Sequence, residues 1–137
     1  SLDVIKTLED ENIRVNVTAI LSFGQLALAA KAGASYVSIF SGRVSDEGHD
    51  SSKLISQSAD WLKLWGYKAQ IIVGSVREAI NLQDAALAGA HILTIPPQFL
   101  DKWVDHYYTR ATVQGFNKDA AAALAKAESM QKEADVR

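Results

Sequence analysis

Four short apolar segments alternate with predicted helices through the first hundred residues of the chain. The segments cover residues 13–20, 36–40, 70–74 and 91–95, and each has a length typical of a β-strand. Helices are predicted over residues 2–11, 23–32, 51–65, 78–88 and 98–108, with a further helix from residue 117 onward. Strict alternation with short connections indicates parallel strands joined by right-handed crossovers. The chain is therefore predicted to be an α/β protein.

The ends of two predicted helices repeat one pattern. Residues 28–34 and 85–90 each contain an alanine-rich helix end, a glycine stop and the start of a β-segment. Asn12 is expected to end the first helix in a left-handed conformation.

An open doubly wound sheet and a barrel are both compatible with this βα repeat. Polar residues at inward positions of successive strands favour a barrel whose interior leads to a site. These residues are Asn16, Thr18, Ser38, Ser75 and Thr94.

The segment 36–40 is the clearest strand. Its alternation places Tyr36, Ser38 and Phe40 on one face and Val37 and Ile39 on the other, and we expect both faces to be covered. It leads into Ser41-Gly42-Arg43 and then an acidic turn over residues 44–48. In α/β proteins, ligands usually bind beyond the carboxyl ends of parallel strands. In the segment 13–20, the same alternation places Val15, Val17 and Ala19 on one face and Asn16 and Thr18 on the other.

Composition excludes several classes of protein. The 137 residues are 48% hydrophobic and 22% charged, which predicts one folded domain over residues 1–137. A net charge of -2 provides no basic surface for nucleic acid or for an anionic membrane. No segment is predicted to span a membrane or to act as a signal peptide. The absence of cysteine excludes a disulfide and is consistent with a cytoplasmic location. His49, His91 and His106 lack metal-ligand spacing, so we predict no metal and no cofactor.

Three residues after the second and third strands form a predicted anion site. Arg43 carries a guanidinium group that matches the oxygen atoms of a phosphate. Ser75 and Arg77 add donors beside a predicted helix N-terminus, which also favours an anion. A surface role is the alternative for Arg43, with Asp46 or Glu47 as its ion-pair partner. Likewise, Asn16 and Thr18 could simply fill a layer of the barrel interior.

These motifs resemble the transaldolase family, in particular its small branch with fructose-6-phosphate aldolase. The resemblance runs in order from Ile5 to Leu100. It is carried by Asn16-Val17-Thr18 and by residues 36–43, 45–48, 74–77 and 88–96. The resemblance implies a (β/α)8 TIM barrel in which a lysine forms a Schiff base with a ketose phosphate. The four strands of this chain would then be the fifth to eighth strands, a half-barrel with a C-terminal helix.

The resemblance also implies roles for individual residues. Arg43, Ser75 and Arg77 would bind the substrate phosphate. Ser38 and Phe40 would line the sugar pocket. Asn16 and Thr18 would hold the substrate or a catalytic water near the Schiff base, which makes Thr18 the candidate catalytic residue.

The reactive lysine of the family is missing from the matching region. In the family it lies on the fourth strand, in a Val-Lys-Ile-Pro-like run that would precede Ser1. The lysines of this chain fall on predicted helices or before a strand, so none is placed to have the lowered pKa that Schiff-base chemistry needs. We therefore expect this chain to be inactive by itself.

Three functions remain open at this point. The first, which we favour, is the phosphate-binding half of a Schiff-base aldolase or transaldolase of carbohydrate metabolism. The second is a half-barrel that binds sugar phosphates without chemistry or has a structural role, and the third is an unrelated open-sheet phosphate-binding domain. A half-barrel would leave undefended edges at residues 15–20 and 91–95. We therefore expect a homo-oligomer or a missing N-terminal half as its partner.

Overall fold

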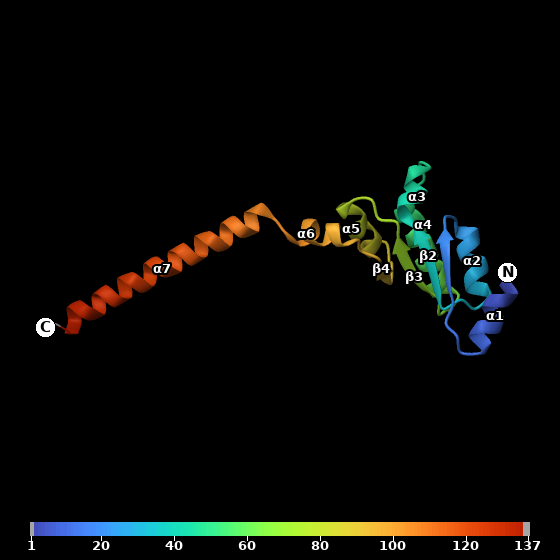
Figure 1. Cartoon of the computed structure of the whole chain (residues 1–137), viewed down its shortest axis with the longest axis horizontal. Helices are drawn as coiled ribbons and strands as arrows, with labels where there is room; N and C mark the ends of the chain where they lie inside the picture. Colours follow the sequence, from blue (N-terminus) through green and yellow to red (C-terminus); the bar gives the residue numbers. More distant parts are fainter. Residues whose placement is uncertain (1, 136–137) are drawn as a thin grey trace. The chain divides into compact units, whose positions relative to one another are not determined.

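A computed structural model of the chain describes residues 2–135. The chain divides into two compact units, Ser1–Leu100 and Asp101–Arg137. The strands and most of the helices belong to the first unit (Figure 1). In chain order the elements are α1 (Leu2–Asp10), β1 (Asn16–Ile20), α2 (Phe23–Lys31), β2 (Tyr36–Phe40), α3 (Ser41–Asp46), α4 (Ser51–Leu64), β3 (Gln70–Gly74), α5 (Ala79–Leu87), β4 (Ile92–Leu93), α6 (Pro97–Val104) and α7 (Tyr107–Asp135).

The four strands form one parallel sheet in the order β1-β2-β3-β4. The predicted α/β class and the parallel pairing are therefore confirmed. The arrangement, a parallel sheet with a helix between successive strands, is consistent with half of a TIM barrel. The pairing of Phe40 with Gly74 aligns the carboxyl ends of β2 and β3. Two strands are shorter than predicted, since β1 begins at Asn16 and β4 contains only Ile92 and Leu93.

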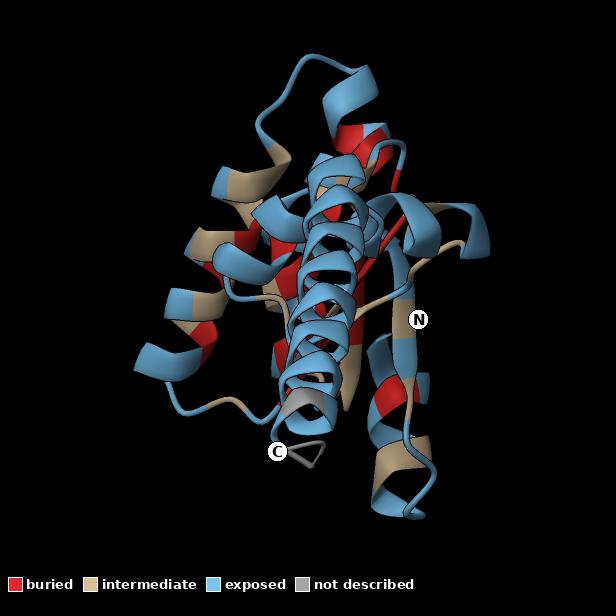
Figure 2. Cartoon of the chain, turned by 90° about the vertical axis from the view of Figure 1, so that its left-hand side faces the viewer, coloured by how far each residue is buried: buried red, intermediate tan, exposed pale blue. Residues whose placement is uncertain are grey.

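The core lies between the sheet and its helices. On β2 and β3 the side chains that point toward the helices are completely buried, including Val37, Ile39, Ile71 and Val73. They pack against apolar side chains of the helices, such as Leu26 of α2. Figure 2 shows these buried residues, in red, gathered in the strands and the adjoining helix faces of the first unit. Burial of this apolar surface is the main stabilising term of the unit.

The opposite face of the sheet is less covered than expected. On β2, Ser38 is buried but Tyr36 and Phe40 are only half-buried. The side chain of Thr18 on β1 is exposed, and so is Ile92 on β4, at 38%. The expectation that both faces of the 36–40 segment would be covered is met fully only on the Val37 and Ile39 side.

A β-bulge changes the predicted faces of β1. Val17 pairs with Val37, whereas the next pair joins Ile20 to Ile39, so Thr18 and Ala19 together lie opposite Ser38. Ala19 takes a left-handed φ of 57°. The extra residue turns Ile20 into the core, where it is 2% exposed, and leaves Ala19 exposed. The predicted face shared by Val17 and Ala19 was therefore wrong, because simple alternation cannot include a bulge.

Two other segments differ from the prediction. The residues expected to form an acidic turn contain the short helix α3, and the turn itself is confined to Glu47 and Gly48. The C-terminal region is helical from Tyr107 rather than from residue 117, because Gly115 is accommodated within the single long helix α7. The described residues of α7 are exposed along its length, as Figure 2 shows. Within residues 2–135, the helices lack the combination of length and apolar character needed to cross a membrane.

Candidate functional site

The segments that follow β2 and β3 are joined directly to each other. The backbone N–H of Gly42 donates a hydrogen bond to the carbonyl oxygen of Ser75 at 3.0 Å. The hydroxyl group of Ser41 donates to the carbonyl oxygen of Gly74 at 3.2 Å. These bonds link the first residues of α3 to the loop after β3. The start of α3 and the loop after β3, which together carry the predicted anion site, are therefore in contact at the carboxyl end of the sheet.

Gly42 is needed for this close approach. A Cβ atom at position 42 would lie 2.0 Å from the carbonyl oxygen of Ser75 and 2.7 Å from Cγ of Arg77. Contacts this short are forbidden, so only glycine fits where α3 meets the loop after β3. Ser75 itself has a left-handed φ of 58°, which is unfavourable for a residue with a side chain. Strained residues of this kind are often found at functional sites.

Arg77 forms an ion pair with Asp46 rather than remaining free. Its Nη2 atom donates a hydrogen bond to Oδ2 of Asp46 at 2.8 Å, which ties the loop after β3 to the end of α3. Both side chains are 57% exposed. The alternative in which Asp46 is the ion-pair partner of Arg43 is therefore wrong. The carboxylate contacts the arginine of the neighbouring loop, 31 positions away in the sequence.

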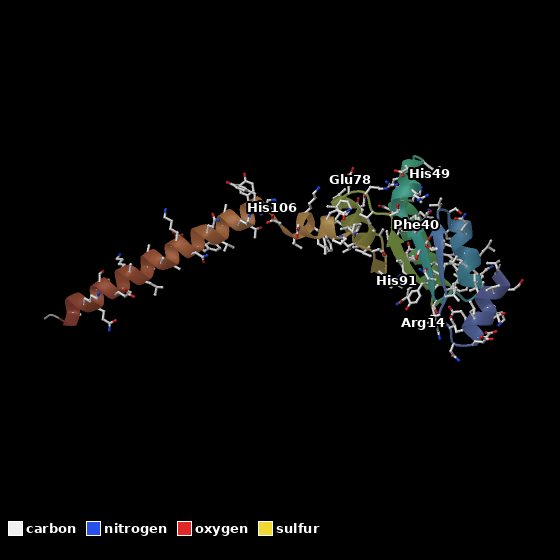
Figure 3. The ribbon with its side chains drawn as sticks, viewed as in Figure 1. Arg14, Phe40, His49, Glu78, His91 and His106 are labelled. Atoms are coloured by element: carbon white, nitrogen blue, oxygen red, sulfur yellow. The ribbon has the colours of Figure 1, made fainter. Side chains whose placement is uncertain are left out.

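Arg43 lies against an aromatic ring of the same site. The guanidinium carbon of Arg43 is 5.9 Å from the centre of the Phe40 ring, within the range of a cation–π contact. Carbon atoms of that ring also lie 3.8 Å from the place where a Cβ of Gly74 would be. Phe40 therefore covers the end of β3 and supports Arg43, which is itself exposed. Figure 3 labels Phe40, the last residue of β2.

The polar residues on the less covered face are partly connected. The hydroxyl group of the buried Ser38 donates a hydrogen bond to Oδ1 of Asn16 at 2.8 Å. This contact confirms that the two residues share a face, as the sequence predicted. Thr18 lies exposed at the bulge, two positions after Asn16. Asn16 and Ser38 are thus in contact, and Thr18 lies opposite Ser38 at the bulge, whereas Arg43, Ser75 and Arg77 follow the ends of β2 and β3.

Comparison with known proteins identifies the family. A family model described as "Transaldolase/Fructose-6-phosphate aldolase" matches residues 1–136. The chain belongs to the transaldolase/fructose-6-phosphate aldolase family. The resemblance drawn from the sequence motifs is therefore confirmed.

Curated relatives of the chain carry the name "Probable transaldolase". A "Probable transaldolase" of Bacillus cereus is 43% identical over 118 residues, which are 86% of this chain and 55% of that protein. A "Probable transaldolase" of Agathobacter rectalis is 40% identical over 123 residues, or 90% of this chain and 57% of the relative. One from Nitrosopumilus maritimus is 43% identical over 119 residues, covering 86% and 54%. The chain spans about half the length of these relatives.

Solved structures show similarity of fold at low sequence identity. A chain described as a lactate oxidase of Pediococcus acidilactici matches with a TM-score of 0.53 and 22% identity, over 69% of this chain and 26% of its own. A flavocytochrome b2 variant matches with a TM-score of 0.56 and 17% identity over the same shares. At these identities the similarity concerns the α/β architecture alone.

The positions of the lysines limit the chemistry that the described part of this transaldolase family member can perform. Within residues 2–135 no lysine lies on a β-strand, since the lysines fall on helices except for Lys68 in the loop before β3. In the same range, no three His, Asp or Glu side chains gather in a way that could hold a metal ion. The described part of the chain thus has two arginines after the carboxyl ends of β2 and β3 but no lysine on the sheet.

Glu9 is a well-connected residue that the sequence did not single out. Its Oε1 atom accepts hydrogen bonds from the backbone N–H groups of Val15 and Ser35, both at 2.7 Å, and its Oε2 atom accepts one from the Ser35 hydroxyl at 2.9 Å. The Val15 bond is the main cause that lowers the pKa of Glu9 below its ordinary value of 4.5, with further lowering by Ser35 and the charge of Arg14, although burial acts in the opposite direction.

Glu9 belongs to the end of the sheet remote from the anion site. With Arg14 it lines a cavity of about 460 Å³ at the amino ends of β2 and β3. Figure 3 shows Arg14 and His49 at opposite ends of the first unit. In barrel enzymes the amino end of the strands contributes stability rather than chemistry. No sequence motif marks Glu9, because its partners Val15 and Ser35 come from two separate loops and meet it only in the folded structure.

Proposed function

We propose that this chain supplies the phosphate-binding half of a Schiff-base transaldolase or aldolase that acts on ketose phosphates. The observation that carries the proposal is the contact between the start of α3 and the loop after β3, which brings Arg43, Ser75 and Arg77 to one end of the sheet in a member of this family. Two guanidinium groups and a strained serine at the carboxyl ends of parallel strands suit a phosphate dianion.

The proposed roles follow from chemistry and position. Arg43 and Arg77 neutralise the phosphate and donate hydrogen bonds to its oxygen atoms, and Ser75 adds a donor. Phe40 holds Arg43 in place and borders the sugar site. Ser38 and Asn16 bind the sugar hydroxyl groups through their existing polar pair.

Thr18 is the proposed catalytic residue. It is exposed on the same face, where its hydroxyl group can hold a water near the reacting carbon. In this proposal β1 to β4 correspond to the fifth to eighth strands of the family's barrel.

The reacting lysine comes from outside the described sheet. A Schiff-base amine needs a buried position or nearby cations to lower its pKa, and strand positions of the barrel interior meet that need. Because no lysine between residues 2 and 135 lies on a strand, we propose that the lysine belongs to the other half of the barrel. That half is either a further segment of the polypeptide or a partner, and a second copy of this chain would cover the open face without supplying a strand lysine.

A unit that binds sugar phosphate without chemistry is the second candidate. The same lack of a strand lysine favours it. The full reading frame distinguishes the two candidates. An upstream strand with a Val-Lys-Ile-Pro-like run supports the enzyme, and its absence supports the binding unit.

The anion site is tested by titration calorimetry. We expect Arg43→Ala to weaken binding of fructose 6-phosphate and of inorganic phosphate by about tenfold or more, because a charge-assisted hydrogen bond contributes about 1.5–3 kcal/mol. Arg14→Ala is the matched control, since it removes an exposed arginine at the other end of the strands. Equal phosphate affinity in the wild type and in Arg43→Ala would contradict the proposed site. Unphosphorylated fructose should show no difference between these variants.

A further inference from the structure

Asp46 is an acidic residue at the centre of a region proposed to bind an anion. It is the last residue of α3, and its carboxylate accepts the hydrogen bond from Arg77 Nη2. The stem of Arg77 lies against the backbone of Gly42, within 2.7 Å of where a Cβ atom would be. The side chain of Arg77 is therefore held at two places, by the Asp46 carboxylate at its guanidinium group and by Gly42 along its stem. The remaining N–H groups of Arg77 take no part in the Asp46 contact.

The ion pair contributes little to folding. Both side chains are 57% exposed, and exposed ion pairs contribute little to stability because water and salt screen them. Its effect on Arg77 is more direct. A long arginine side chain loses rotational freedom when it binds a ligand, and that loss weakens binding unless the side chain is already ordered.

We propose that Asp46 is a positioning residue for the anion site, which orders the guanidinium group of Arg77 before the phosphate arrives. This inference rests on the proposed function, in which Arg77 contacts the phosphate. The negative charge of Asp46 by itself repels an anion, so ordering and electrostatics act on phosphate affinity in opposite directions. The sign of the change in Asp46 variants therefore reveals which effect dominates.

The experiment measures the affinity of the full chain for inorganic phosphate. We expect Asp46→Ala to bind phosphate up to about fivefold more weakly than the wild type, although a repelling charge has been removed. Asp46→Asn keeps an oxygen acceptor for Arg77 and should remain within about twofold of the wild type. Glu47→Gln is the matched charge control. It removes a neighbouring negative charge that forms no recorded ion pair within residues 2–135, so it should leave phosphate affinity unchanged or slightly raise it.

A second measurement shows whether Asp46 acts through Arg77. In an Arg77→Ala background, Asp46→Ala should cause no further loss of affinity, because the side chain that it positions is absent. Nitrogen NMR of the arginine side chains supplies a readout that does not depend on binding. The Arg77 guanidinium signals should show slow motion in the wild type and in Asp46→Asn, and fast motion in Asp46→Ala.

The possible outcomes separate the two proposals. Phosphate binding by Asp46→Ala that equals or exceeds that of the wild type, with Arg77→Ala still weakened, overturns the positioning role and leaves the anion site intact. If Arg43→Ala and Arg77→Ala both bind phosphate like the wild type, the anion site itself is wrong and the positioning role fails with it. Weaker binding in Asp46→Ala, rescue in Asp46→Asn and no change in Glu47→Gln would together support the inference.

Discussion

The backbone N–H of Gly42 and the carbonyl oxygen of Ser75 form a 3.0 Å hydrogen bond that joins the start of α3 to the loop after β3. At this bond the two backbones lie so close together that no side chain fits at position 42. The contact sets the spacing of the groups that follow it, including Arg43 and Arg77. The proposed anion site therefore depends on Gly42, a residue that has no side chain.

Gly42→Ala tests this dependence. The new methyl group would overlap the Ser75 carbonyl oxygen, so the loops must separate. We expect a loss of about 2 kcal/mol in the free energy of unfolding, together with weaker phosphate binding. Urea denaturation and calorimetry measure the two effects.

Gly24→Ala is the control for the glycine substitution. Nothing lies within 4 Å of a Cβ atom at this position in α2, and alanine is a better helix former than glycine. This variant should gain stability by about 0.5–1 kcal/mol. A Gly42→Ala variant with wild-type stability and affinity would show that the loops are not constrained as described.

The bulge in β1 predicts that glycine and valine at position 19 change the free energy of unfolding in opposite directions. Its left-handed φ of 57° is unfavourable for residues with a Cβ atom. Ala19→Gly should raise the unfolding free energy by about 0.5 kcal/mol, because relief of backbone strain exceeds the added freedom of the unfolded chain. Ala19→Val should lower it by about 1 kcal/mol, since a β-branched residue tolerates this conformation least. Thermal and urea unfolding of both variants are the measurement, and a more stable valine variant would argue against the bulge.

Glu9 predicts a dependence of stability on pH. Its pKa is lowered in the folded protein, so its ionised form stabilises the fold above the unfolded pKa near 4.5. That contribution is lost as the pH falls through the lower folded pKa. The stability difference between wild type and Glu9→Gln should therefore be largest above about pH 5 and should shrink below the unfolded value. Urea midpoints measured from pH 3 to pH 7 test this, and a difference that grows toward low pH would contradict the sign.

Borohydride trapping tests the proposed source of the lysine. With fructose 6-phosphate, this chain alone should form no stable adduct, because its lysines between residues 2 and 135 lie on helices or in a loop. Mass spectrometry of the reduced sample detects one adduct per chain if any forms. A stoichiometric adduct on a lysine of this chain would remove the need for a second half.

The assembly of the sheet is tested by sedimentation. β1 pairs only with β2 and β4 only with β3 within the described residues, so each has an edge of unpaired backbone groups. Such edges and the exposed Ile92 favour association. We expect a homodimer or larger oligomer of the chain at tens of micromolar, or a complex with a separate N-terminal half. A stable monomer with a cooperative thermal transition would contradict the half-barrel.

Local patterns determined the features that depend on neighbouring residues. The faces of β2 follow from its alternation, so the burial of Val37 and Ile39 could be predicted. Asn12 could be placed in a left-handed helix stop, and it has a φ of 63°. The family motifs also placed the candidate anion residues after β2 and β3. These features need only the spacing of side chains along one segment.

Tertiary structure alone decided which side chains meet across segments. The pairing of Arg77 with Asp46 joins residues 31 positions apart, and Glu9 bonds to Ser35 across 26 positions. The bulge at Ala19 is likewise seen only in the folded sheet, where it places Ile20 opposite Ile39 of β2 and in the core. The packing of the helices on the sheet sets these distances. A sequence pattern cannot set them, because it leaves several possible partners for one charge. For that reason the sequence could place the candidate residues after the strand ends, but it could not assign their contact partners.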